Sequence, residues 1–282
     1  MTLCQRDRGR GKSIGMPTFL HRSLAFCSAA MLFVGCAAQP VNPSLPTTTP
    51  QAQCDLSRMK ASPGQLERPL VIIGGFADPG IAAGSLKREF DAMTRGRRII
   101  AVSLWWRWSA EACRREVIRA VDCAFPNTDP KRTSEVDVIG YSLGGFAARY
   151  AAVGSSANCR TLRIARLFAI SSPLQGADDV CRWPALLPIQ KDLRPGSAVL
   201  SRINASAAPY PIFAYVRLGD HPVGVANAAP PGRVAWWVAT PAFEDAHNGA
   251  YKDPRILADI ARRLRGETPA AHDPPAPLPA GP

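Results

Sequence analysis

Ser142 is the residue of this chain best placed to do chemistry, because it lies at the centre of the motif GYSLG at residues 140–144. A Gly-x-Ser-x-Gly turn between a strand and a helix holds its serine up at the edge of a sheet and needs small residues on both sides. An apolar run at 136–139 precedes the motif, and a helical pattern at 143–153 follows it. This context favours a nucleophilic serine over an ordinary glycine-rich turn.

A serine hydroxyl is a weak nucleophile until a base accepts its proton, and the chain offers four histidines for that task. His21 falls in a leader segment and His272 in a proline-rich tail. His247 follows the last expected strand and precedes the last expected helix, where the base stands when the chain order is serine, acid, histidine. His221 directly follows the best acid and cannot easily fold back onto it. We predict His247 as the base; its alternative is a surface-loop histidine.

The acid that orients this base should lie at the end of a strand near the histidine loop. Asp220 follows the expected strand at 212–218 after Gly219, so we predict it as the acid. Its alternative role is that of a structural turn aspartate. The other acids lie in earlier loops or too close to His247 in sequence: Asp178, Asp179, Asp192, Glu244 and Asp245.

Acyl chemistry at a serine also needs N–H donors for the oxyanion of the intermediate. Leu143, the residue after the nucleophile, is expected to supply one. The other is expected from the loop after the strand at 70–73, which begins Gly74-Gly75-Phe76, with the Phe76 N–H as the best candidate. The alternative for the two glycines is a tight turn without a role.

The elements that must position these residues alternate between strands and helices. Short apolar runs predict strands at 70–73, 98–104, 136–139, 163–170, 212–218 and 234–239, and helical patterns predict helices at 86–93, 109–124, 143–153 and from Pro254 onward. Such alternation predicts an α/β fold with a mostly parallel central sheet and helices on both faces. Ligands of such sheets bind beyond the carboxyl ends of the strands. No internal repeat is visible.

The charge balance raises nucleic acid or an anionic membrane as a partner, because 34 basic residues face 22 acidic ones, for a net charge of +12. Five of the basic residues and only one acid fall within the first 35 residues. The remaining arginines are scattered, and aromatic residues are not interleaved with them as a stacking platform needs. We therefore expect no nucleic-acid partner.

The N-terminal segment, residues 1–35, is predicted to be a signal peptide, because its apolar run at 24–34 is about half the length that spans a bilayer. Phe33-Val34-Gly35-Cys36 resembles a bacterial lipobox, so Cys36 is the expected lipidation site; a plain secretory signal is the alternative, and Met16 is an alternative start. We expect a lipidated Cys and flexible tether at 36–69, the folded domain at 70–266 and a disordered Pro/Ala-rich tail at 267–282.

Cysteine usage agrees with export to an oxidising compartment. Cys113 and Cys123 are expected on one helix, too far apart to pair. Cys159 with Cys181 is the favoured disulfide, and Cys54 is the fifth cysteine of the exported part, although connectivity stays open. No CxxC motif occurs, so no metal site is expected.

Several blocks together resemble the lipase and esterase branch of the α/β-hydrolase fold, over about residues 69–264. They are GYSLGGFAARY at 140–150, SSPLQG at 171–176, DLRPGSAVL at 192–200, Gly219-Asp220 and the His247 loop. The resemblance implies Ser142 as nucleophile, Asp220 as acid, His247 as base, and Phe76 with Leu143 as oxyanion donors. Two positions depart from the family pattern: Tyr141 and Gly74 stand where histidine is common.

The resemblance implies two-step hydrolysis of carboxylic esters without a cofactor, with an ester or lipid as substrate. Trp105, Trp106 and Trp108 are candidates for an acyl pocket or for packing against a helix, and residues 174–200 for a lid. Acyl transfer by the same residues, or a non-catalytic envelope binding protein on this scaffold, are the alternatives. The expected location is the bacterial envelope, on the periplasmic or outer side of a membrane reached through a lipid anchor. Acyl chain length and oligomeric state stay open.

Overall fold

The computed structural model of the protein describes residues 42–96, 98–156, 159–182 and 184–280. The predicted signal peptide and Cys36 lie outside these residues. The chain divides into residues 1–38 and 39–282, and everything described below belongs to the second unit. Within the described ranges, no helix combines the length and the apolar character that crossing a membrane would need.

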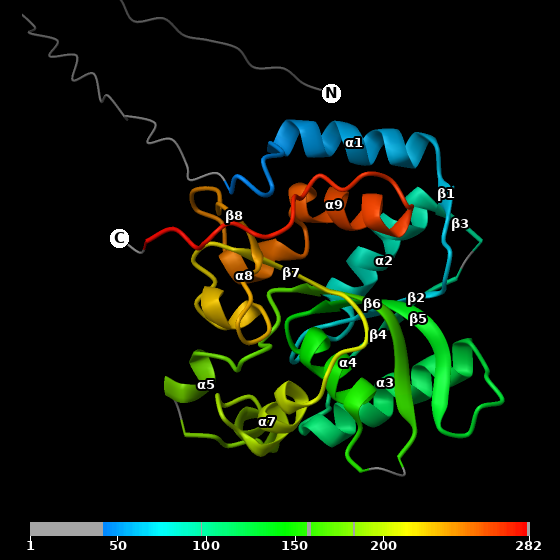
Figure 1. Ribbon diagram of the computed structural model, residues 1–282, viewed down its shortest axis with the longest axis vertical. Helices are drawn as coiled ribbons and strands as arrows, with labels where there is room; N and C mark the ends of the chain where they lie inside the picture. Colours follow the sequence, from blue (N-terminus) through cyan, green and yellow to red (C-terminus); the bar gives the residue numbers. More distant parts are fainter. Residues whose placement is uncertain (1–41, 97, 157–158, 183, 281–282) are drawn as a thin grey trace, which may run out of the picture. The chain divides into compact units, whose positions relative to one another are not determined.

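A six-stranded parallel sheet forms the centre of the domain (Figure 1). Its strands run in the order β4 (Ile99–Val102), β2 (Leu70–Ile73), β5 (Arg132–Tyr141), β6 (Thr161–Ile170), β7 (Ile212–Arg217) and β8 (Trp236–Val238). All neighbouring pairs are parallel, so the carboxyl ends of all six strands lie at one edge. The strand order reverses between β2 and β5, which is where ligands bind in such sheets.

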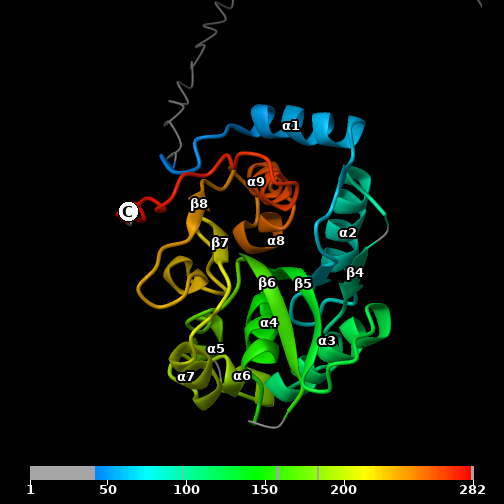
Figure 2. The ribbon, with the colours of Figure 1, turned by 45° about the vertical axis from the view of Figure 1, so that its right-hand side comes forward.

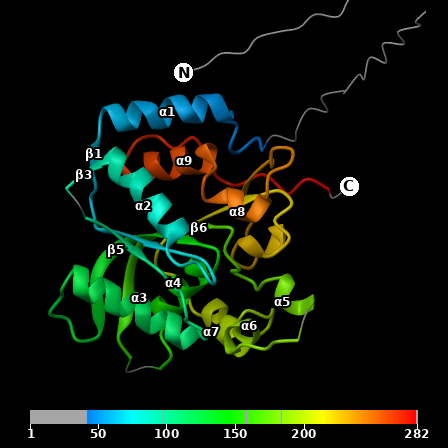
Figure 3. The ribbon, with the colours of Figure 1, turned by 180° about the vertical axis from the view of Figure 1, so that it is seen from behind.

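Helices cover both faces of the sheet (Figures 2 and 3). On one face lie α3 (Ala110–Ala124) and α4 (Leu143–Val153); on the other lie α2 (Ile81–Met93) and α9 (Pro254–Leu264). Side chains of β2 alternate between the two cores, with Val71 and Ile73 in the first and Leu70 and Ile72 in the second. The predicted α/β fold class, a mostly parallel sheet with helices on both faces, is therefore confirmed.

Smaller elements surround this frame. After β6 come α5 (Asp179–Arg182), α6 (Pro188–Asp192) and α7 (Ala198–Ala205); a 3-10 turn, η1 (Val225–Ala228), follows β7, and α8 (Ala246–Ala250) precedes α9. A separate two-stranded sheet pairs β1 (Gly64–Gln65) with β3 (Thr94–Arg95). None of these was predicted from the sequence as an element of its own.

The expected tether contains a helix, α1 (Thr49–Ala61), so the prediction for its later part is wrong. Thr48 and Gln51 form a capping box at its start, where Pro50 fits without losing a hydrogen bond. Leu56 and Met59 of this helix are buried. Of the prolines that made this segment resemble a linker, Pro43 and Pro46 precede the helix, Pro50 lies in its first turn, and Pro63 and Pro69 follow its end.

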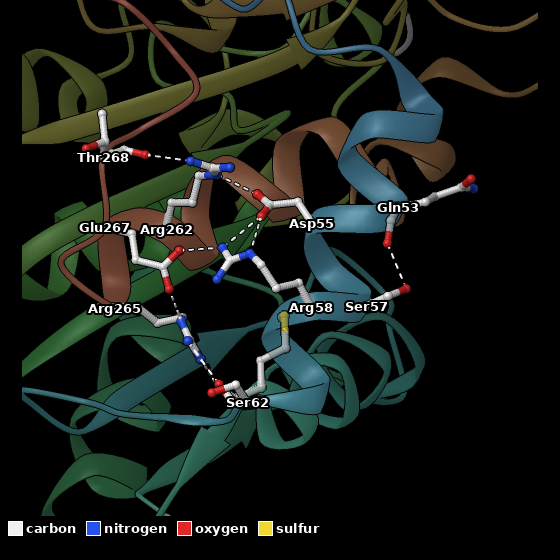
Figure 4. Close-up of polar contacts among 10 residues, drawn as sticks. Gln53, Asp55, Ser57, Arg58, Ser62, Arg262, Arg265, Glu267 and Thr268 are labelled. Carbon is white, nitrogen blue, oxygen red and sulfur yellow. Dashed lines mark hydrogen bonds and ion pairs between the residues drawn. The ribbon is translucent and has the colours of Figure 1, made fainter.

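Ion pairs fasten α1 to α9 and to the residues that follow α9 (Figure 4). Asp55 accepts hydrogen bonds from Arg58, at 2.8 Å, and from Arg262 of α9. Arg58 also donates to Glu267 at 2.6 Å. Burial opposes ionisation of Asp55, but both arginines outweigh it and lower the pKa of its carboxyl group.

The proline-rich tail packs against β8, which corrects the expectation of a disordered segment at 267–282. The indole N–H groups of Trp236 and Trp237 donate to the carbonyls of His272, at 2.9 Å, and of Pro277, at 3.1 Å. His272 in turn donates its backbone N–H to Ser44 at 2.6 Å. Proline lacks an N–H donor but keeps its acceptor, so indole donors on an edge strand can order such a segment.

The five cysteines of the described residues are all free thiols, which corrects the expected Cys159–Cys181 disulfide. Cys159 lies just before β6, whereas Cys181 lies in α5, beyond the other end of that strand. A strand of ten residues spans about 33 Å, so the two thiols sit toward opposite edges of the sheet. Cys113 and Cys123 share α3 as predicted.

Candidate active site

Ser142 occupies a strained turn between β5 and α4, with φ 51° and ψ −122°. A Cβ atom at Gly140 would lie 2.4 Å from the backbone nitrogen of Gly145, and one at Gly144 would lie 2.2 Å from the carbonyl oxygen of Ile73 in β2. Neither glycine of the GYSLG motif therefore leaves room for a side chain. The Ser142 N–H donates to the Ile170 carbonyl at 2.9 Å, which ties the turn to β6.

The structure brings the three predicted residues of the site together. Nε2 of His247 lies 3.0 Å from Oγ of Ser142, and Nδ1 lies 3.0 and 3.1 Å from the two carboxylate oxygens of Asp220. The Asp220 side chain is fully buried, and His247 is 11% exposed. Because a carboxylate only accepts, Nδ1 carries the proton and Nε2 is free to accept one from the serine. Val223 donates its N–H to Asp220 at 3.2 Å and fixes the carboxylate.

The short helix α8 carries His247. Asp245 caps it by accepting the N–H of Asn248 at 2.6 Å. The Tyr141 hydroxyl lies 3.2 Å from Oδ1 of Asn248 and 3.4 Å from the carbonyl of His247, so the residue before the nucleophile contacts the helix of the base. Burial raises the pKa of Tyr141 far above its usual range, and the phenol therefore stays a neutral donor.

The loop after β2 passes directly against the nucleophile. A Cβ atom at Gly75 would lie 3.3 Å from Cβ of Ser142. Phe76 and Leu143, the two predicted oxyanion donors, both line the pocket that holds Ser142. Leu143 is the first residue of α4, where backbone N–H groups have no partner within the helix and the helix dipole favours negative charge.

Asp78 shapes the same loop, and no sequence signal identified it. Its carboxylate accepts N–H groups at the start of α2, from Gly80 at 3.0 Å and from Ile81 at 2.6 Å. Its backbone carbonyl accepts the Ser103 hydroxyl at 2.8 Å. The loop that presents Phe76 is thereby held to both α2 and the end of β4.

A pocket of about 540 Å³ opens at Ser142 and His247. Its wall is mostly apolar, and the segment predicted as a lid contributes Ala177, Val180, Ile189 and Leu193 to it. None of the three tryptophans expected near an acyl pocket lines it. Instead Trp106 contacts both Trp105 and Trp108, and the ring centroid of Trp108 lies 5.6 Å from that of Phe76.

Ser171 and Ser172 follow β6 beside the nucleophile turn. The Ser172 hydroxyl lies 3.1 Å from the Gly140 carbonyl, which braces the turn. Ser171 adopts φ 47° and its buried hydroxyl has no hydrogen-bond partner among the described residues. No trio of His, Cys, Asp or Glu in the described part of the chain is arranged to hold a metal ion.

The strand order and the strained serine turn after β5 are those of the α/β-hydrolase fold. No profile of a known protein family matches the sequence, and no curated protein matches it either. Solved structures do match. A Listeria innocua protein (lin2722) is 13% identical, with a TM-score of 0.47, and the match covers 71% of this chain and 95% of that one.

Two further structures have similar values. A lipase-esterase related protein from Clostridium acetobutylicum is 12% identical at a TM-score of 0.41, covering 72% of this chain and 97% of its own. A Pyrococcus furiosus esterase is 14% identical at a TM-score of 0.41, covering 73% and 84%. At such identities the activity of these proteins does not transfer to this chain, and the fold assignment rests on the topology and the serine turn.

Proposed function

We propose that the protein is a serine hydrolase that cleaves carboxylic esters through an acyl-enzyme intermediate. The observation that carries this proposal is the continuous chain of hydrogen-bond distances from Ser142 through His247 to the buried Asp220, inside an apolar pocket. A protein that only binds ligands on this scaffold would have no need to keep the three side chains within hydrogen-bond distance of one another.

The reaction begins with His247 Nε2 accepting the Ser142 proton while Oγ attacks the ester carbonyl. Asp220 stabilises the imidazolium that forms. The tetrahedral intermediate collapses when His247 gives the proton to the leaving alcohol, which breaks the ester C–O bond and leaves an acyl-serine. Water, deprotonated by the same nitrogen, then attacks the acyl group, and the acid departs as Ser142 regains its proton.

The backbone N–H groups of Phe76 and Leu143 are the proposed donors to the oxyanion. Donors of this kind act on charge that exists only in the intermediate, and each contributes several kcal/mol in other enzymes. The close approach of Gly75 to Ser142 and the place of Leu143 at the start of α4 support this role.

The surroundings of the pocket support an ester with an apolar acyl group. In the described residues, the exposed large apolar side chains belong to segments that follow the carboxyl ends of the strands, the edge that carries the site. Phe76 and Ile81 line the pocket, and Leu186 donates its N–H to Gln190 in the pocket wall. The exposed large apolar residues are Phe76, Ile81, Trp105, Trp106, Leu186 and Phe243.

Membrane attachment is a second part of the proposal and rests on the sequence around Cys36. Five residues separate Cys36 from Asn42, the first described residue. Since an extended residue spans about 3.5 Å at most, a lipid on Cys36 would keep Asn42, where the described domain starts, within roughly 20 Å of the membrane. The test is labelled-palmitate incorporation and membrane fractionation of the wild type and Cys36→Ser; an unlabelled wild type would contradict the anchor.

Hydrolysis of p-nitrophenyl esters of graded chain length tests the activity. The wild type should release p-nitrophenol, and Ser142→Ala should be inactive although folded. A serine on the same sheet but outside the pocket, in Ser134→Ala, serves as the matched control and should keep full activity. Equal turnover by the wild type and Ser142→Ala would remove the nucleophile assignment. Analysis of products with added alcohol separates hydrolysis from acyl transfer.

A further inference from the structure

Arg217 ends β7, three residues before Asp220, and its side chain is only 5% exposed. Its Nε donates to Oδ2 of Asp253 at 2.8 Å, and its Nη1 donates to Oε2 of Glu244 at 2.6 Å. Asp253 is fully buried, whereas Glu244 is half exposed. The guanidinium group therefore joins two carboxylates that come from different loops.

These two carboxylates stand on either side of α8, the helix of His247. Glu244 precedes the first residue of α8 by two positions, and Asp253 follows the last by three. Between them, a Cβ atom at Gly249 would lie only 2.1 Å from Nη1 of Arg217. The guanidinium thus packs directly against the backbone of α8, and glycine is the residue that allows this approach.

A helix of five residues has too few internal hydrogen bonds to hold its own position, so tertiary contacts must place it. Asp220 reaches His247 from the same strand end that carries Arg217, and the Asp220 N–H donates to the Arg217 carbonyl at 3.3 Å. One short turn therefore supplies both the acid and the cation that holds the helix of the base.

We propose that Arg217 is a positioning residue that clamps both ends of α8 and so sets the distance of His247 from Asp220 and Ser142. This inference rests on the proposed esterase function. It does not make Arg217 a catalytic residue, because the side chain binds Glu244 and Asp253 and is absent from the pocket wall.

Without Arg217, the buried Asp253 carboxylate keeps another arginine partner. Asp253 also accepts hydrogen bonds from Arg255, at 2.9 and 2.7 Å, so Arg217→Met does not leave its buried carboxylate unpaired. The freed helix can then shift. Misplacement of a reacting group by 1 Å costs about 100-fold in rate, so we expect Arg217→Met to lower kcat by about 10- to 100-fold and to change KM by less than about threefold.

The control is Arg114→Met. Arg114 is also nearly buried and bidentate, with 2.8 Å bonds to both oxygens of Glu111, but it lies on α3 outside the pocket. It should lose a similar amount of thermal stability and keep kcat within about twofold. If Arg217→Met keeps kcat within that range while folded, the positioning role is overturned.

Hydrogen–deuterium exchange of residues 244–253 gives a readout that does not need activity. Exchange there should be faster in Arg217→Met than in the wild type or Arg114→Met. If the wild type hydrolyses no ester, the proposed function fails, and unchanged exchange in this segment would separately overturn the clamp. If Arg217→Met does not fold, Gly249→Ala takes its place, because its Cβ displaces the guanidinium; an unchanged kcat in that variant would also overturn the inference.

Discussion

The hydroxyl of Tyr141 lies 3.2 Å from Oδ1 of Asn248, so the residue before the proposed nucleophile is joined to the residue after the proposed base. The Tyr141 ring also lies 5.4 Å from the His247 ring and 4.9 Å from that of Tyr251. A neutral phenol therefore connects the serine turn with α8.

Tyr141→Phe should lower kcat by about threefold to tenfold, because the contact that it removes is a single neutral hydrogen bond of about 1 kcal/mol. Thermal unfolding should show a loss of similar size. Tyr215→Phe is the control: it removes a buried phenol that donates to Asp259 at 2.6 Å, away from the pocket, and should cost stability without slowing ester hydrolysis. Equal kinetic losses in both variants would contradict a local role.

Asp220→Asn should lower kcat by roughly 10⁴-fold, because an amide in place of the carboxylate favours the wrong histidine tautomer. The variant should stay folded, since the substitution keeps the shape of the side chain and its acceptor for the Val223 N–H. Steady-state kinetics and the rate of Ser142 labelling by a phosphonate inhibitor measure the effect. A loss of less than about tenfold would point to another acid.

Gly144→Ala should destabilise the protein and abolish activity, because the new Cβ would lie 2.2 Å from a backbone oxygen of β2 that cannot move aside. Gly84→Ala is the matched control. Its Cβ would meet nothing nearer than 3.7 Å, within helix α2, so it should stabilise the protein by about 1 kcal/mol. Chemical denaturation of the two variants gives the comparison, and similar midpoints would contradict it.

Stability at acid pH should depend on Asp253. Burial opposes ionisation of its carboxyl group, but Arg255 and Arg217 outweigh burial and hold its pKa below the usual value. The pKa of Asp253 in the folded protein lies below its unfolded value of about 3.9. The ionised carboxylate therefore contributes fully to the free energy of unfolding above about pH 4, and this contribution is lost as the pH falls through the lowered folded pKa. Urea unfolding between pH 2 and 6 should show the wild type approaching Asp253→Asn in stability toward the acid end. A constant difference between them would refute this linkage.

Truncation after Gly266 should lower the unfolding temperature and promote association, because it removes the acceptors of Trp236 and Trp237 and uncovers the edge strand β8. The specific activity of the folded fraction should remain, since no tail residue lines the pocket. Calorimetry measures the unfolding temperature, and light scattering measures association. An unchanged unfolding temperature would mean that the tail contributes nothing to stability.

Local signals account for what the sequence predicted well. The strand at 70–73 is a run of four apolar residues, and it appears with those boundaries. The start of the last helix at Pro254 also followed from neighbours in sequence, and in the structure Asp253 caps it. The placement of Ser142 followed from the two glycines around it, whose positions leave no room for a side chain. This constraint acts within a few residues of the motif.

Long-range pairing accounts for what was missed. Arg217 reads as an ordinary residue in a strand, and only the fold brings Glu244 and Asp253 to it. Helix α1 buries Leu56 and Met59 in a core that only the fold assembles, and its charged residues pair with partners about 200 positions away. Sequence order gave the candidates Asp220 and His247, but the 3.0 Å separation between them is a product of the tertiary structure.

The hydrogen bond from the His272 N–H to the Ser44 carbonyl also connects the two ends of the described domain. It brings the beginning and the end of the described domain to one corner, so the polypeptide nearly closes into a ring. A circular permutant that joins the two ends through a short linker and opens in the exposed loop at 127–131 should therefore fold and keep the site intact.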